Sequence, residues 1–108
     1  MTRRNPQAAA HAPRDRTLAE ALVDEMAERG HNQSDAASEM GVSTANMSRW
    51  LAAADPMIPD GKTAESLANI DRIVRYLRLP NRDAYAVLAF RSVVREMLRR
   101  ERQARHED

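Results

Sequence analysis

Apolar side chains recur at helical spacing in five successive segments, and no segment shows the period of two that marks a strand. Local signals mark where the segments begin and end. Thr17 fits a capping box closed by Glu20, Asn32 and Ser43 can cap the next two helices, and Gly30 suits a left-handed helix end. The predicted helices span about residues 17–29, 33–40, 44–53, 63–79 and 82–102. We therefore expect an all-α domain of five helices with a long C-terminal helix.

The second and third predicted helices are short and meet through a tight turn, residues 41–44. Gly41 can adopt a positive φ, and Ala37 is small enough to let the third helix cross closely. Met47 and Trp50 stand three residues apart, so they share the inner face of the third helix. Around Gly41, the expected core of the pair consists of Ala36, Ala37, Met40, Val42, Met47, Trp50 and Leu51. This arrangement predicts a helix-turn-helix.

The opposite face of the third helix is small and polar and carries one cation. It consists of Thr44, Ala45, Ser48, Arg49 and Ala52. Hydroxyls can bond phosphates or base edges, alanine can meet a thymine methyl group, and Arg49 can make a bidentate contact with guanine. No acid occurs between Glu39 and Asp55, although the surrounding sequence is acidic. Such a face suits the major groove of duplex DNA.

These residues resemble the Cro/C1-type (Xre-like, phage repressor) helix-turn-helix family over about residues 17–79. The matching positions are Gln33, Ala37, Gly41, Val42, Ser43, Met47, Trp50 and Leu51. The resemblance implies a lambda repressor-like fold and a sequence-specific regulator of transcription, a repressor of bacterial or phage type. It also implies that the third helix faces the bases and that the start of the second helix holds phosphates. A loop with two prolines, residues 52–62, replaces the short turn usual in the family.

We expect base contacts from Thr44, Ala45, Ser48 and Arg49. Lys62 lies just before the fourth helix, whose N-terminus attracts anions. The arginines near the N-terminus either enter a minor groove or form a disordered tail. The expected phosphate contacts are Asn32, Gln33, Ser43, Asn46, Lys62, Arg3 and Arg4.

The net charge of +1 conceals an uneven distribution. Residues 17–71 carry ten acids against three basic residues, whereas residues 72–105 carry ten arginines against three acids. Because phosphate contact dominates affinity for DNA, the acidic middle weakens binding by the helix-turn-helix alone. We expect it to need the basic N-terminal arm, the C-terminal arginines or a second copy of the chain.

The last predicted helix combines a basic stripe with apolar residues over most of its remaining circumference. The stripe consists of Arg91, Arg95, Arg99 and Arg102, which either touch phosphates or meet the acidic surface of residues 17–39. One apolar face can cover the core, and a second is left for another chain. We assign dimerisation to Phe90, Val93, Val94 and Met97 and expect a homodimer. The alternative is a monomer whose last helix only wraps the domain.

The predicted organisation is a flexible basic arm at 1–15, a helix-turn-helix DNA-binding domain at 16–80, and a C-terminal helix with a charged tail at 81–108. The chain has no cysteine and no apolar run long enough to span a membrane, so we expect a cytoplasmic protein. No catalytic constellation or metal-ligand spacing is present, and we expect no enzyme activity, cofactor or small-molecule ligand. The rival function is a protein-interaction module (an antitoxin, or a phage assembly or regulatory factor) that uses the apolar last helix.

Overall fold

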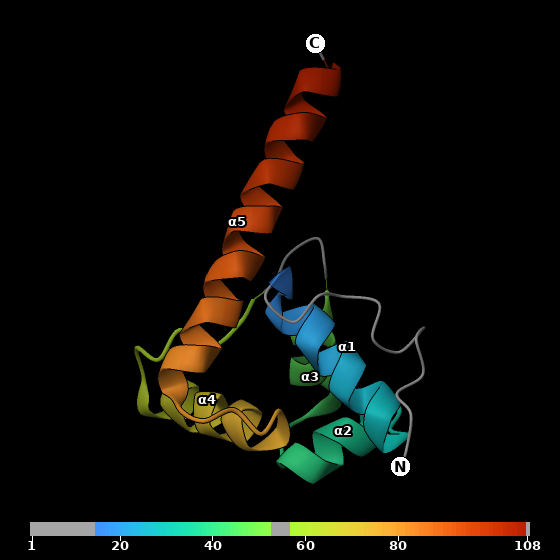
Figure 1. Cartoon of the computed structure of the whole chain (residues 1–108), viewed down its shortest axis with the longest axis vertical. Helices are drawn as coiled ribbons and strands as arrows, with labels where there is room; N and C mark the ends of the chain where they lie inside the picture. Colours follow the sequence, from blue (N-terminus) through green and yellow to red (C-terminus); the bar gives the residue numbers. More distant parts are fainter. Residues whose placement is uncertain (1–14, 53–56, 108) are drawn as a thin grey trace.

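The computed structural model describes residues 15–52 and 57–107, with side chains as far as Arg105. These residues form five α-helices and no strand, which confirms the all-α prediction. The helices are α1 (Leu18–Arg29), α2 (Gln33–Met40), α3 (Thr44–Leu51), α4 (Ala64–Tyr76) and α5 (Arg82–Glu107) (Figure 1). The predicted arm, with Arg3 and Arg4, lies outside the described residues except for Asp15.

The first helices begin at the predicted capping residues. Thr17 and Glu20 form the expected capping box of α1, and Ser43 accepts a hydrogen bond from the Asn46 N–H at the start of α3. Asn32 caps α2 in a second capping box, closed by Asp35. Caps of this kind satisfy backbone N–H groups that have no partner within the helix, so each start is specified by nearby sequence.

Three predicted helix ends are wrong. Helix α3 ends at Leu51 because Ala52 is extended, and α4 ends at Tyr76 rather than near Leu79. At the latter end Arg78 takes a φ of 56° and the Leu79 N–H donates to the Val74 carbonyl at 2.9 Å, which is a Schellman-type stop. Helix α5 continues past the predicted residue 102 to 107. Salt bridges one turn apart support its last turns, including that between Arg100 and Glu96.

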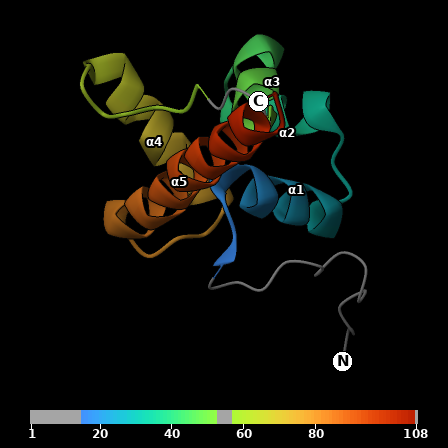
Figure 2. The same cartoon turned by 90° about the horizontal axis from the view of Figure 1, so that it is seen from above.

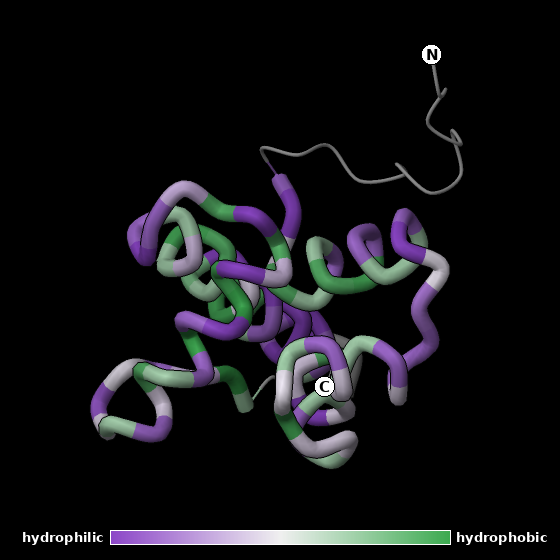
Figure 3. Tube along the Cα trace, turned by 90° about the horizontal axis from the view of Figure 1, so that it is seen from below, coloured by the Kyte–Doolittle hydropathy of each residue, from purple (hydrophilic) through white to green (hydrophobic). Residues whose placement is uncertain are grey.

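A single hydrophobic core lies between the helices. Its fully buried large side chains are Leu18 and Leu22 of α1, Met47 of α3 and Ile73 of α4. Ile73 lies at the centre of the inner face of α4, and Tyr76 is buried beside it. The predicted core residues Val42 and Leu51 are only partly buried, as are Leu67 and Val74 of α4 and Leu77, which follows it. Hydrophobic and hydrophilic stretches alternate along each helix, as amphipathic helices require (Figure 3).

Helix α5 lies between α1 and α4 and packs against both (Figures 1 and 2). Tyr85 and Leu88 on its inner side are buried. Farther along, the buried Ser92 hydroxyl accepts a hydrogen bond from the Leu18 N–H at 3.0 Å and donates to the Leu88 carbonyl. The C-terminal part of the helix then extends beyond the other helices (Figure 1).

Candidate nucleic-acid interface

Helix α3 separates its side chains into a buried and an exposed face, as predicted. Met47 is fully buried and Trp50 is 3% exposed, so both point into the core. The four residues expected to contact bases, Thr44, Ala45, Ser48 and Arg49, are all exposed. The prediction that they share one accessible face is confirmed, and the face carries no acidic side chain.

Arg49 is the cation of this face. Its guanidinium donates to the Asn46 side-chain oxygen at 3.3 Å, one turn earlier on the same helix. Among the described residues, no carboxylate forms a salt bridge with Arg49. The contact with Asn46 aligns Arg49 along α3 and leaves most of its five N–H donors available. This contact uses only the oxygen of the Asn46 side chain, so it does not involve the amide N–H groups, which are the donors that a phosphate requires.

The start of α2 is less favourable for phosphate than the sequence suggested. The Asn32 side-chain oxygen accepts from the Asp35 N–H at 2.8 Å, and the Asp35 carboxylate accepts from the Asn32 N–H at 3.1 Å. An anion therefore already occupies the positive end of the helix. Gln33 is exposed beside it, and its neutral amide can still donate a hydrogen bond. The start of α3 differs, because Ser43 caps it without a nearby acid in the first turn.

Lys62 is exposed just before α4, next to a small cleft of about 230 Å³ that α3 and α4 share. Asn46 and Trp50 line the α3 side of this cleft, and Thr63 lines the α4 side. Lys62 itself does not line this cleft, and a carboxylate lies near it. Asp60 accepts from the Lys62 N–H at 2.9 Å, and this hydrogen bond lowers the pKa of the Asp60 carboxyl.

The loop before Lys62 is anchored to α5. The Tyr85 hydroxyl donates a hydrogen bond to the Pro59 carbonyl oxygen, and burial raises the pKa of Tyr85 far above its usual value. Tyr85 therefore remains a neutral donor at any physiological pH. Residues 52–62 were predicted as a loop with two prolines, and this contact fixes the position of the second, Pro59.

Two arginines of the basic stripe of α5 contact the start of α1 and the residues just before it. Arg95 forms a salt bridge with Glu20 at 2.7 Å and donates to the Asp15 carbonyl, while Arg91 donates to the Arg16 carbonyl. Arg99 pairs with Glu96 at 2.7 Å within the helix. Of the two predicted roles for the stripe, contact with the acidic surface of residues 17–39 is supported by the Arg95–Glu20 pair. Arg102 is exposed near the end of α5.

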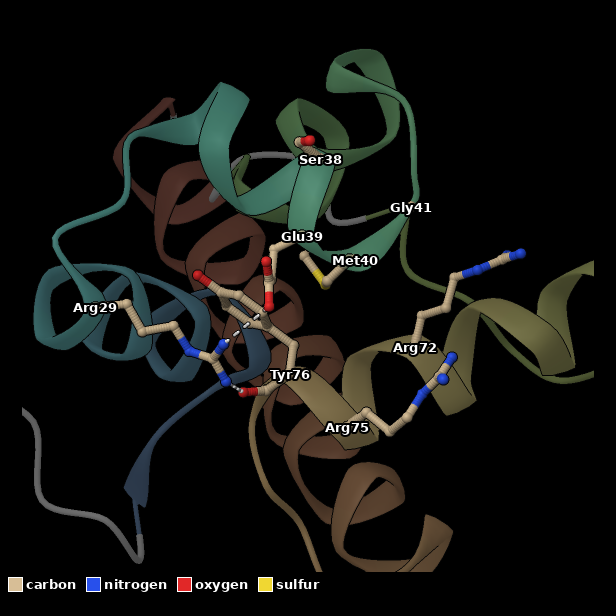
Figure 4. A pocket seen from close by; sticks show the side chains of 8 residues that line it. All are labelled: Arg29, Ser38, Glu39, Met40, Gly41, Arg72, Arg75 and Tyr76. Carbon is tan, nitrogen blue, oxygen red and sulfur yellow. Dashed lines mark hydrogen bonds and ion pairs between the residues drawn. The ribbon is translucent and has the colours of Figure 1, made fainter.

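A second cleft, of about 330 Å³, lies between the end of α2 and the C-terminal half of α4. Arg72 and Arg75 extend from α4 in one direction, while Arg29 lies against Tyr76 on the other side (Figure 4). Arg29 also forms a salt bridge with Glu25 at 2.8 Å and lies 3.9 Å from a carboxylate oxygen of Glu39, which offset its charge. Arg72 and Arg75 were not among the predicted site residues. Their spacing of three residues on one helix was the available signal.

No family model matches the chain, and neither curated proteins nor solved structures show significant similarity to it. The fold alone therefore defines its class, a five-helix all-α protein over the residues described. Within those residues, no group of histidine and acidic side chains is arranged to hold a metal ion, and no helix is long and apolar enough to cross a bilayer.

Proposed function

We propose that the chain is a sequence-specific double-stranded DNA-binding protein of the helix-turn-helix class, and that it regulates transcription as a repressor of bacterial or phage type. In this proposal α2 and α3 are the two helices of the motif, and α3 enters the major groove. The observation that carries it is the exposed, acid-free face of α3 bearing Arg49, set against the buried Met47 and Trp50.

The turn between α2 and α3 supports this proposal. Gly41 has a φ of 75°, and its N–H donates to the Ser38 carbonyl, while the Val42 N–H donates to the Ala37 carbonyl at 2.9 Å. This Schellman-type stop lets the chain turn within three residues, Gly41–Ser43, and start α3 at Thr44. The two helices therefore pack as a unit with Ala37 buried beneath the crossing. A rigid pair of this kind can present one helix to a groove.

The side chains of α3 suggest separate roles. Arg49 is proposed to contact guanine, while Thr44, Ala45 and Ser48 make shorter-range contacts with base edges. The Ser43 hydroxyl, the Asn46 amide and Lys62 are proposed to hold phosphates on either side of α3, with Asn32 and Gln33 making weaker contacts because of Asp35. Phosphate contacts set the register of the helix, and base contacts set the preferred sequence.

Electrostatics limits how tightly one copy can bind. Arg29, Arg91, Arg95 and Arg99 are engaged by carboxylates or main-chain carbonyls within the described fold. Few cations then remain near α3 to displace counterions from DNA. We expect specific binding to require a second copy of the chain or the N-terminal arginines.

The test is a fluorescence-anisotropy titration of the full chain, first with random duplex DNA at several salt concentrations and then with a selected site. A steep fall in affinity with salt supports the proposal. Arg49→Ala should weaken binding to the selected site by about 1–3 kcal/mol and relax the preference at one base pair. Arg102→Ala, an exposed arginine remote from α3 in sequence, is the control and should leave that preference unchanged.

The alternative function is a protein-interaction module. The exposed apolar residues of α5, Phe90 and Met97 among them, favour this alternative because a DNA-binding monomer does not need them. The salt titration separates the two functions: absence of binding to any duplex at about 50 mM salt excludes the DNA-binding proposal. If Arg49→Ala weakened binding to all DNA sequences equally, the result would indicate that Arg49 contacts a phosphate and not a base.

A further inference from the structure

The cleft between the end of α2 and the C-terminal half of α4 carries an excess of positive charge. Its lining includes three arginines, Arg29, Arg72 and Arg75, against one carboxylate, Glu39. Its volume of about 330 Å³ is at the lower end of the range usual for small-molecule sites, roughly 300–1,000 Å³. The cleft is therefore large enough for a small organic anion, although no small-molecule ligand is evident from the sequence.

The three arginines of the cleft have different surroundings. Arg29 is engaged on one side by a carboxylate oxygen of Glu39, at 3.9 Å, and by the ring of Tyr76. Arg72 and Arg75 extend from α4 on the other side, away from Glu39 (Figure 4). The carboxylate of the cleft therefore pairs with Arg29 and leaves the charges of the other two arginines uncompensated.

The neighbours of Arg72 and Arg75 on α4 do not neutralise them either. Arg72 donates to the side-chain oxygen of Asn69 at 2.8 Å, a neutral partner that orients the guanidinium. Asp71, one turn before Arg75, already accepts two hydrogen bonds from Arg82, at 2.8 and 2.9 Å. Within the described part of the chain, no carboxylate forms a salt bridge with Arg72 or Arg75. The pair can therefore take its counter-charge from a bound anion.

The last residues of α2 form the facing wall of the cleft. Met40 is 6% exposed and lines the cleft beside Gly41, so it offers an apolar surface. The carbonyls of Ala37 and Ser38, near the negative end of α2, already accept hydrogen bonds from the turn that follows. An apolar part of a ligand can therefore lie against Met40 while its anionic part lies toward α4.

We propose that this cleft binds a small phosphate monoester, with Arg72 and Arg75 holding the phosphate and Met40 contacting the organic part. A monoester phosphate carries nearly two negative charges at neutral pH, which matches the two arginines. Guanidinium groups bind phosphate oxygens through paired N–H donors. Each phosphodiester of DNA carries a single charge, so the arginine pair suits a monoester better. This binding is separate from the proposed function and needs no DNA.

Two-dimensional amide NMR spectra of the full chain, recorded without DNA and at constant ionic strength, test the site with phenyl phosphate as the probe. The shifts should saturate with a dissociation constant on the order of 0.1–1 mM and be concentrated in residues 38–42 and 69–76. Methyl phenyl phosphate, the diester with the same ring, should bind at least ~3-fold more weakly because it has lost one charge. Absence of saturation, shifts spread over all the arginine-rich surfaces, or equal binding of the two probes would overturn the proposal.

Substitutions of arginine separate the site from general attraction between charges. Arg75→Gln should raise the dissociation constant for phenyl phosphate at least ~10-fold, because charged hydrogen bonds are lost. Arg75→Lys keeps the charge but loses the planar donors, so its dissociation constant should lie between those of Arg75→Gln and the wild type. Arg78→Gln is the matched control, because Arg78 is exposed just after α4, does not line the cleft and carries the same charge. The control should change the constant less than ~2-fold, and equal effects of Arg75→Gln and Arg78→Gln would contradict a built site.

Duplex DNA is the other source of phosphate, and the same variants distinguish it. If Arg72→Gln and Arg75→Gln weakened binding to DNA but left binding of phenyl phosphate unchanged, the pair would contact the DNA backbone and the proposal would be wrong. Failure of the proposed function appears instead in the salt dependence of DNA binding and in Arg49→Ala, neither of which involves the cleft. Circular dichroism spectra that match the wild type ensure that each variant is folded.

Discussion

The guanidinium carbon of Arg29 lies 4.1 Å from the centre of the Tyr76 ring, and the same guanidinium donates a hydrogen bond to the Tyr76 main-chain carbonyl. The Tyr76 hydroxyl is in turn 2.9 Å from the Nδ1 atom of His31. These contacts join the C-terminal ends of α1 and α4, which are far apart in the sequence. Arg29 therefore acts as a bridge between these two helix ends.

Replacing Arg29 should destabilise the protein measurably. Arg29→Ala removes the contact with the ring and the hydrogen bond to the carbonyl, and we expect the free energy of unfolding to fall by about 1–3 kcal/mol. Arg29→Lys keeps the charge but loses the planar donor group, so its free energy of unfolding should lie between those of Arg29→Ala and the wild type. Urea denaturation measures both, and Arg102→Ala should stay within about 0.5 kcal/mol of the wild type. Equal stability of Arg29→Ala and the wild type would contradict the bridge.

Ser92 links α5 to the first residue of α1. Ser92→Ala leaves the buried Leu18 N–H without the hydroxyl that accepts its hydrogen bond. We expect the free energy of unfolding to fall by about 1–3 kcal/mol. Ser34→Ala, at an exposed position of α2, is the control and should change stability by less than about 0.5 kcal/mol. Thermal and urea denaturation of the two variants give the comparison. Similar small losses in both would mean that the Leu18 N–H finds another partner.

The glycine at the α2–α3 turn is needed for its backbone conformation and not because a side chain would clash there. Gly41 has a φ of 75°, but an added Cβ would meet no atom within 4 Å. Gly41→Ala should therefore lower the free energy of unfolding only by the cost of a left-handed backbone at alanine, about 1–2 kcal/mol. Gly30 has the same geometry and should lose a similar amount, whereas at Gly61 an added Cβ would also lie 3.2 Å from Ile70. Urea denaturation should rank Gly61→Ala as the most damaging of the three.

Stability should fall in acid because carboxyl groups that accept hydrogen bonds from arginines, Asp71 and Glu96, have lowered pKa values. The hydrogen bonds from Arg82, at 2.8 and 2.9 Å, lower the pKa of Asp71, and those from Arg99 and Arg100 lower the pKa of Glu96. Each folded pKa lies below the unfolded value near 4, so the contribution is complete above about pH 5 and declines as the pH falls through the folded value. Unfolding of Asp71→Asn, measured from about pH 6 to pH 2, should depend less steeply on pH than that of the wild type. If the pH dependence of unfolding were unchanged in this variant, Asp71 would not contribute to the loss of stability in acid.

The parts of the fold that sequence predicted are those specified by neighbouring residues. The caps at Thr17, Asn32 and Ser43, and the left-handed Gly30 and Gly41, depend on side chains or backbone freedom within a turn of the helix end. The exposed face of α3 follows equally from its helical period. Helix ends set by other chemistry were missed, notably the arginine in a left-handed conformation that ends α4.

Contacts between distant segments could not be predicted from one sequence. Tyr76 is buried because Arg29 and His31 approach it from α1 and the turn that follows α1, and no local pattern encodes that approach. The partners of the α5 arginines were left open for the same reason, since charge counts cannot choose between phosphates and carboxylates. The role of Asp35 was also missed, although its spacing from Asn32 matches that of a capping box.

Trp50 is the one tryptophan of the chain, and it lies buried on the inner face of α3 beside the cleft shared with α4. Its indole fluorescence therefore comes from a single known place, directly behind the face proposed to meet DNA. Emission at short wavelength should mark the docked helix, and a shift to longer wavelength should mark its release into water. The protein thus contains its own optical probe of α3, and every titration described above can be followed without attaching a dye.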